Sequence, residues 1–123
     1  MMRRIFCLLV VLTAATGTSL GGEADVVKVE AVQSSARTYD FHVSVRHADE
    51  GWDHYANVWQ VVAPDGSVLG ERVLLHPHET EQPFTRSLMG VSIDEGIDSV
   101  GVRAGDKVHE FGGAEVTVKL PGR

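Results

Sequence analysis

Hydrophobic and polar residues alternate along most of the chain after its first two dozen residues. The sequence reads FHVSVR at 41–46, VGVRA at 100–104 and VTVKL at 116–120. A period of two sends successive side chains to opposite faces, so each segment predicts a strand with one buried and one solvent-facing side. No window of helical length repeats apolar residues at the spacing of an amphipathic helix. The pattern therefore predicts an all-β protein.

Turn-forming residues separate these segments. The sequence APDG at 63–66 combines a proline, which presets φ, with a glycine that accepts the left-handed conformation, and DEG at 94–96 is similar. Short strands with a turn about every ten residues are typical of an antiparallel sandwich. Seven strands are expected, at residues 26–32, 38–47, 55–63, 67–75, 84–93, 98–105 and 114–120.

The first 24 residues have the order of a secretory signal peptide. Arg3 and Arg4 precede an apolar run, IFCLLVVLTAA at 5–15, and small residues follow. The run is shorter than the ~20 residues of a membrane-spanning helix, and a retained anchor is the alternative. Cleavage before Asp25, Gly22 or Thr18 would satisfy the small-x-small rule. We expect a signal peptide at 1–24, one domain at 25–123, no membrane span after processing, and a periplasmic or secreted location.

The composition and motifs of the sequence argue against several kinds of catalytic and binding chemistry. Cys7 is the only cysteine and lies within the apolar run, so the processed chain would have no disulfide, thiolate ligand or thiol nucleophile. The 11 Lys and Arg against 17 Asp and Glu give a net charge of −6, which disfavours nucleic acid as a partner. There is no G-x-S-x-G elbow and no glycine-rich phosphate loop. We therefore expect a protein that is not an enzyme.

The stretch VSIDEGIDSVGVRAGDKVHEFGGAEVTVKL at 91–120 resembles the last third of fibronectin type III and related immunoglobulin-like domains. The resemblance implies an immunoglobulin-like sandwich, in which Trp59 on the third strand would be buried. The chain departs from antibody-type domains in lacking a cysteine pair and a tyrosine in the usual corner position. The segments HADEGWDHYANVW and LLHPHETEQPFTR also resemble small exported bacterial proteins of uncharacterised function, which supply no function.

Antiparallel order gathers five histidines at one end of the predicted sandwich. We call this end the histidine pole; it carries the loops 48–54, 76–83 and 106–113. A missed strand between residues 47 and 109 would scatter the set, whereas His42 is expected alone on an outer strand face. The gathered histidines are His47, His54, His76, His78 and His109.

One interpretation of the histidine pole is a periplasmic metal site. Neutral imidazole is a common ligand of zinc and copper. In an extended segment residues i and i+2 project to the same side, so His76 and His78, stiffened by Pro77, could share one ion with His54, His47 or His109 as a third ligand. The carboxylates of Asp49, Glu50 and Asp53 could ligate as well, or fix a histidine tautomer.

The broader interpretation, which we favour from the sequence, is a non-catalytic, metal-free interaction module. The same loops would bind a protein or a cell-envelope partner. The residues expected to contact it are Trp52, Tyr55, Asp49, Glu50 and Asp53. No cofactor is certain from the sequence, and zinc or copper are the candidates. Imidazoles that converge on one point would favour metal, whereas imidazoles bonded to separate carbonyls would favour the module.

Overall fold

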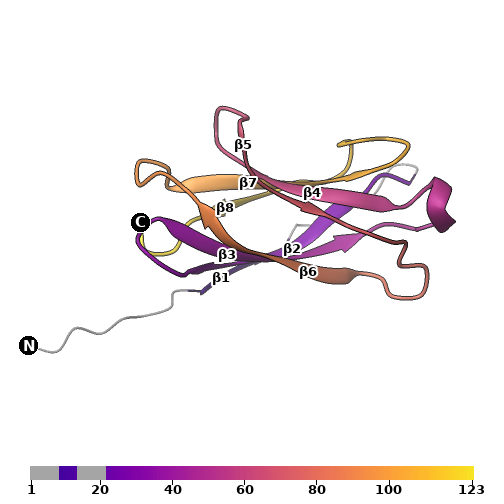
Figure 1. Ribbon diagram of the computed structural model, residues 1–123, viewed down its shortest axis with the longest axis horizontal. Helices are drawn as coiled ribbons and strands as arrows, with labels where there is room; N and C mark the ends of the chain where they lie inside the picture. Colours follow the sequence, from indigo (N-terminus) through magenta and orange to yellow (C-terminus); the bar gives the residue numbers. More distant parts are fainter. Residues whose placement is uncertain (1–8, 14–21) are drawn as a thin grey trace, which may run out of the picture.

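The computed structural model describes residues 9–13 and 22–123, and it is an antiparallel β-sandwich (Figure 1). A single 3-10 turn, η1 (Gly51–Asp53), interrupts the strands of this described part. The seven predicted strands are confirmed within a few residues at each end. Together with one further strand they are β1 (Leu9–Thr13), β2 (Asp25–Gln33), β3 (Thr38–Arg46), β4 (Ala56–Val62), β5 (Val68–Val73), β6 (Phe84–Ser92), β7 (Ser99–Asp106) and β8 (Val116–Lys119).

Two four-stranded sheets form the layers of the sandwich. One sheet has the order β1-β2-β3-β6 and the other β5-β4-β7-β8, and all neighbouring strands are antiparallel. Period-two alternation sends one side of each strand inward, where valines from both sheets meet around Trp59. The side chain of Trp59 is completely buried, so its predicted place in the core is confirmed.

The extra strand, β1, comes from the apolar run that the sequence predicts as part of a signal peptide. It pairs with the outer edge of β2, from Leu9 opposite Val32 to Thr13 opposite Lys28. An apolar run containing β-branched valines suits an open strand edge, which explains the eighth strand. Val10 packs against the core, whereas Val11 is exposed. The proposed basic start, Cys7 and two of the three cleavage positions fall in 1–8 and 14–21, outside the described residues.

Four segments meet at the histidine pole, and they come from both sheets (Figure 1). These are the segment before β2, the β3–β4 loop with η1, the β5–β6 loop and the β7–β8 loop. A bond from the backbone of His78 to Asp49 and one from Lys107 to Trp52 join three of them directly. The polar side chains of the pole are therefore held by backbone groups of neighbouring loops.

Candidate metal centre

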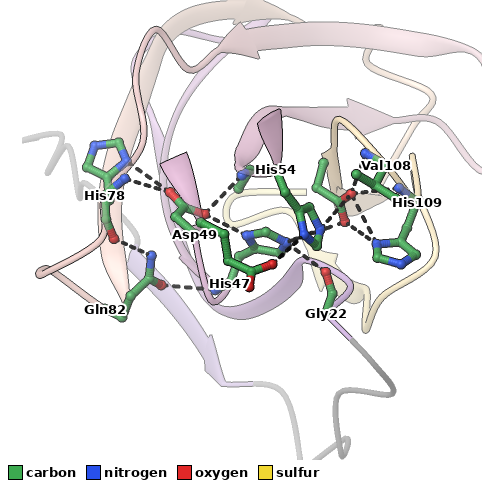
Figure 2. Close-up of polar contacts among 11 residues, drawn as sticks. Gly22, His47, Asp49, His54, His78, Gln82, Val108 and His109 are labelled. Carbon is green, nitrogen blue, oxygen red and sulfur yellow. Dashed lines mark hydrogen bonds and ion pairs between the residues drawn. The ribbon is translucent and has the colours of Figure 1, made fainter. Parts of the chain in front are cut away.

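His47 follows the last residue of β3, and its side chain is completely buried. Nδ1 lies 2.6 Å from Oδ1 of Asp49, whose side chain is also completely buried. Asp49 further accepts the backbone N–H groups of Ala56, at 3.0 Å, and His78, at 2.6 Å. A carboxylate is an acceptor, so Nδ1 of His47 donates to Asp49, and Nε2 faces the middle of the pole (Figure 2).

His54 lies directly after η1 and presents its ring edge-on to His47, with 4.7 Å between the ring centroids. Its Nδ1 lies 2.9 Å from Oε1 of Glu50, so this ring is also held through Nδ1. The Nε2 atoms of His54 and His47 are 3.2 Å apart. Carboxylates therefore orient both imidazoles, and their remaining nitrogens point at one another.

Asp106, the last residue of β7, completes the group, and its side chain is fully buried. Its carboxylate lies 3.6 Å from Nε2 of His47 through Oδ2 and 3.4 Å from Nε2 of His54 through Oδ1. Burial by itself would raise the pKa of Asp106. The backbone N–H groups of His109 and Val108 and the neighbouring His47 outweigh burial, and the pKa is lowered from its usual value. Asp106 is therefore an anion at neutral pH, buried beside two imidazoles.

The spacing of this group suits a small cation. Two ligand atoms of a tetrahedral ion with bonds of ~2.0–2.1 Å are about 3.3 Å apart. The separations of 3.2, 3.4 and 3.6 Å among His47, His54 and Asp106 lie close to that value. These three residues form the one group among the described residues whose ligand atoms all lie within 4.8 Å of one another.

Two further groups border the cluster (Figure 2). The carbonyl oxygen of Gly22 lies 2.7 Å from Nε2 of His47. His109 places its Nδ1 3.2 Å from Oδ1 of Asp106, and its ring centroid is 5.1 Å from that of His54. Five residues from three separate segments of the chain therefore surround one point of the histidine pole.

The structure leaves the His76–His78 pair outside this cluster, which differs from the arrangement expected from its spacing. The two rings are neighbours, with 4.6 Å between their centroids. However, Nε2 of His78 accepts a hydrogen bond from the Arg86 guanidinium at 2.8 Å, and its ring stacks on Phe84 at 4.0 Å. His76 is exposed and bonds to the neighbouring Pro77 carbonyl. A cation that already occupies Nε2 of His78 opposes metal binding there.

The residues expected to contact a partner divide into two groups. Trp52 is 62% exposed and stands edge-on to Tyr55, and its carbonyl accepts a hydrogen bond from Lys107. Glu50 and Asp53 are exposed as well. The prediction that Asp49 contacts a partner is wrong, because its carboxylate is completely buried and faces His47.

The sequence alone did not single out Asp106 or Gly22. Asp106 stands three residues before His109, and this D-x-x-H spacing is the available signal, since one carboxylate can then cap the turn and approach the ring. Gly22 belongs to the segment predicted as a leader, and nothing in its local sequence points to a histidine 25 residues away.

Comparison with known proteins identifies a relative that covers most of this chain. A protein from Halomicrobium mukohataei described as "Putative lipoprotein" is 43% identical over 96 residues, which cover 78% of this chain and 47% of that protein. The chain thus spans about half the length of this relative. No protein-family model matches the chain, and no solved structure matches it. Among the described residues, no helix has the length and apolar character needed to cross a membrane.

Proposed function

We propose that this protein is a non-catalytic binding protein for a divalent transition metal, zinc or copper, held by His47, His54 and Asp106. One observation carries the proposal. Carboxylates hold both imidazoles through Nδ1, so their Nε2 atoms lie 3.2 Å apart beside the buried carboxylate of Asp106. Three ligand atoms from distant strands and loops thus have the mutual spacing that a tetrahedral ion requires.

Protons compete with a metal for imidazole nitrogens. Metal ligation requires the neutral form of the ring. Binding should therefore weaken below about pH 6, near the unperturbed histidine pKa of ~6.5.

The donor set narrows the choice of metal. Two imidazoles and a carboxylate without thiolate suit zinc and divalent copper, and calcium and magnesium prefer oxygen ligands alone. At equal availability, copper should bind more tightly than zinc. Calorimetric titration of tag-free protein with each metal tests the proposal.

The matched variants are single histidine replacements. His47→Ala and His54→Ala should abolish tight binding. His42→Ala should not, because that ring lies on β3 and bonds to Ser87 on β6. Absence of binding heat and of a metal-induced rise in Tm for the wild-type protein would refute the proposed function, since a ligand of the folded state must stabilise it.

Export from the cytoplasm belongs to the same proposal. The basic, apolar and small-residue order of 1–24 supports a signal peptide, and the description of the relative as a lipoprotein supports an exported protein. The two antiparallel sheets support an immunoglobulin-like domain over 25–123. The intact mass of the exported form tests processing, and unprocessed protein in the membrane fraction would contradict it.

A second function, recognition of a protein or cell-envelope partner, is favoured by Trp52. Tryptophan is enriched at binding hot spots, and here Trp52 is 62% exposed while Tyr55 and Lys107 hold the segment that carries it. If this function is correct, Trp52→Ser should abolish the retention of purified protein on isolated envelope fractions. Val68→Ser, which changes an exposed valine on β5, should leave retention unchanged.

A further inference from the structure

The segment before β2 closes one side of the metal centre. Gly22 has φ +88°, and a Cβ added there would lie 3.2 Å from Cε1 of His54 and 3.6 Å from Cε1 of His109. A larger residue would therefore be strained in its backbone and crowded against the ring of His54. The Gly22 carbonyl oxygen lies 2.7 Å from Nε2 of His47, in front of the nitrogen that would ligate a metal.

The residues after Gly22 are anchored to the sandwich. Ala24 is 1% exposed and belongs to the core, and the backbone N–H of Val26 donates to the carbonyl of Ala114 at 2.9 Å. Asp25 accepts the N–H of Ala114 at 2.7 Å. A Cβ on Gly113 would lie only 1.9 Å from the carbonyl oxygen of Ala24, so the two segments are in close contact. These contacts hold the Gly22 carbonyl beside the histidines.

We propose that the carbonyl oxygen of Gly22 is a further ligand of the metal ion, and that export processing leaves Gly22 in the mature protein. This inference rests on the proposed function. The carbonyl oxygen lies 2.7 Å from Nε2 of His47, the nitrogen assigned as a ligand, so an ion bound by that ring would have this oxygen within reach. Backbone carbonyls commonly bind hard cations, and at some copper sites a backbone oxygen is a weak axial ligand beside histidines.

A ligand at Gly22 also discriminates among the cleavage positions that the sequence leaves open. Cleavage before Asp25 would remove this ligand together with Ala24, a core residue. Cleavage before Gly22 or before Thr18 keeps both. The boundary of the mature protein therefore moves from Asp25 to Gly22 or an earlier residue.

The first test compares two glycine substitutions in the exported protein, titrated with Zn²⁺ alone and with Cu²⁺ alone. Gly22→Ala should raise the Kd at least about tenfold, because the strained φ of +88° and the contact of the added Cβ with the His54 ring would displace the carbonyl oxygen from the site. Gly66→Ala is the matched control, because Gly66 has φ +90° and its Cβ would meet nothing within 4 Å. It should carry a similar backbone strain and leave the Kd unchanged.

The outcomes separate this inference from the proposed function. Metal binding by the wild-type protein together with an unchanged or lower Kd for Gly22→Ala would overturn the ligand assignment alone, since the carbonyl would then only accept a hydrogen bond from His47. No binding by the wild-type protein would overturn both proposals. If Gly22→Ala does not fold, the intact mass of the exported wild-type protein still tests the inference. A chain beginning at Gly22 or earlier supports it, and a chain beginning at Glu23 or later overturns it.

Discussion

Replacing Asp49 with asparagine tests the physical basis of the histidine pole. Oδ1 of Asp49 accepts from His47 at 2.6 Å and from the Ala56 N–H at 3.0 Å, while Oδ2 accepts from the His78 N–H at 2.6 Å. An amide has the same shape as a carboxylate but only one oxygen. Whichever way the substituted side chain turns, its NH₂ group would face a backbone N–H, and that donor would be buried without an acceptor.

The magnitude follows from these contacts. A charge-assisted hydrogen bond contributes about 1.5–3 kcal/mol, and an unsatisfied buried donor costs about 1–3 kcal/mol. The two effects together predict that Asp49→Asn lowers the free energy of unfolding by about 3–5 kcal/mol. Since domains are stable by only ~5–15 kcal/mol, the variant should be folded marginally. Its metal affinity should fall about 10–100-fold, because the His47 ring loses the charged group that fixes its proton on Nδ1.

The assay is urea unfolding of the metal-free protein, followed by the fluorescence of buried Trp59, together with calorimetric metal titration of the folded variant. Asp53→Asn is the control, since it removes the same charge from an exposed residue of the same loop. It should change the free energy of unfolding by less than about 0.5 kcal/mol. Equal stability and equal metal affinity for Asp49→Asn and Asp53→Asn would refute the role assigned to the buried carboxylate.

Three further results are expected. Asp106→Asn, which keeps an oxygen for the backbone N–H groups, should weaken Zn²⁺ binding by at least about 100-fold in a calorimetric titration, because a direct ligand matters more than a supporting group. Trp59→Ala should cost about 3–5 kcal/mol in denaturation followed by circular dichroism, and unchanged stability would contradict its completely buried position. Burial, then the charges of Arg86 and His76, lower the pKa of His78, so the stability it contributes is present above its unfolded pKa of about 6.5 and is lost as pH falls through the folded value. The wild-type protein should therefore lose more stability between about pH 7.5 and 5.5 than His78→Gln, and parallel pH profiles would contradict this.

The strands were predictable because burial on one face of a sheet imposes a period of two, and glycine and proline mark the turns. The antiparallel order of the strands was enough to predict which loops lie at the histidine pole, although it did not predict their contacts. The extra strand β1 was not predicted, because an apolar run that precedes small residues matches a signal peptide and an edge strand equally well. Local sequence does not tell whether such a run pairs with β2.

The composition of the candidate site was only partly predictable. His47 and His54 belonged to the predicted set, but the i, i+2 spacing directed attention to His76 and His78. The spacing of residues along the chain indicates which side chains can point the same way. Metal ligation depends instead on which groups each imidazole nitrogen contacts in the folded protein. For His78 that partner is Arg86, and for His47 it is a carboxylate on either side. Such partners come from distant strands, so they are visible only in the folded chain.

The site and the fold depend on the same buried charges. Unpaired buried carboxylates are strongly destabilising, but Asp49 and Asp106 each accept two backbone N–H groups of neighbouring loops. The folded loops therefore fix both carboxylates, and Asp49 in turn fixes the ring of His47. Under the proposed function, an ion would enter a site whose ligand atoms the fold already holds 3.2–3.6 Å apart, so binding should require little movement of the surrounding loops.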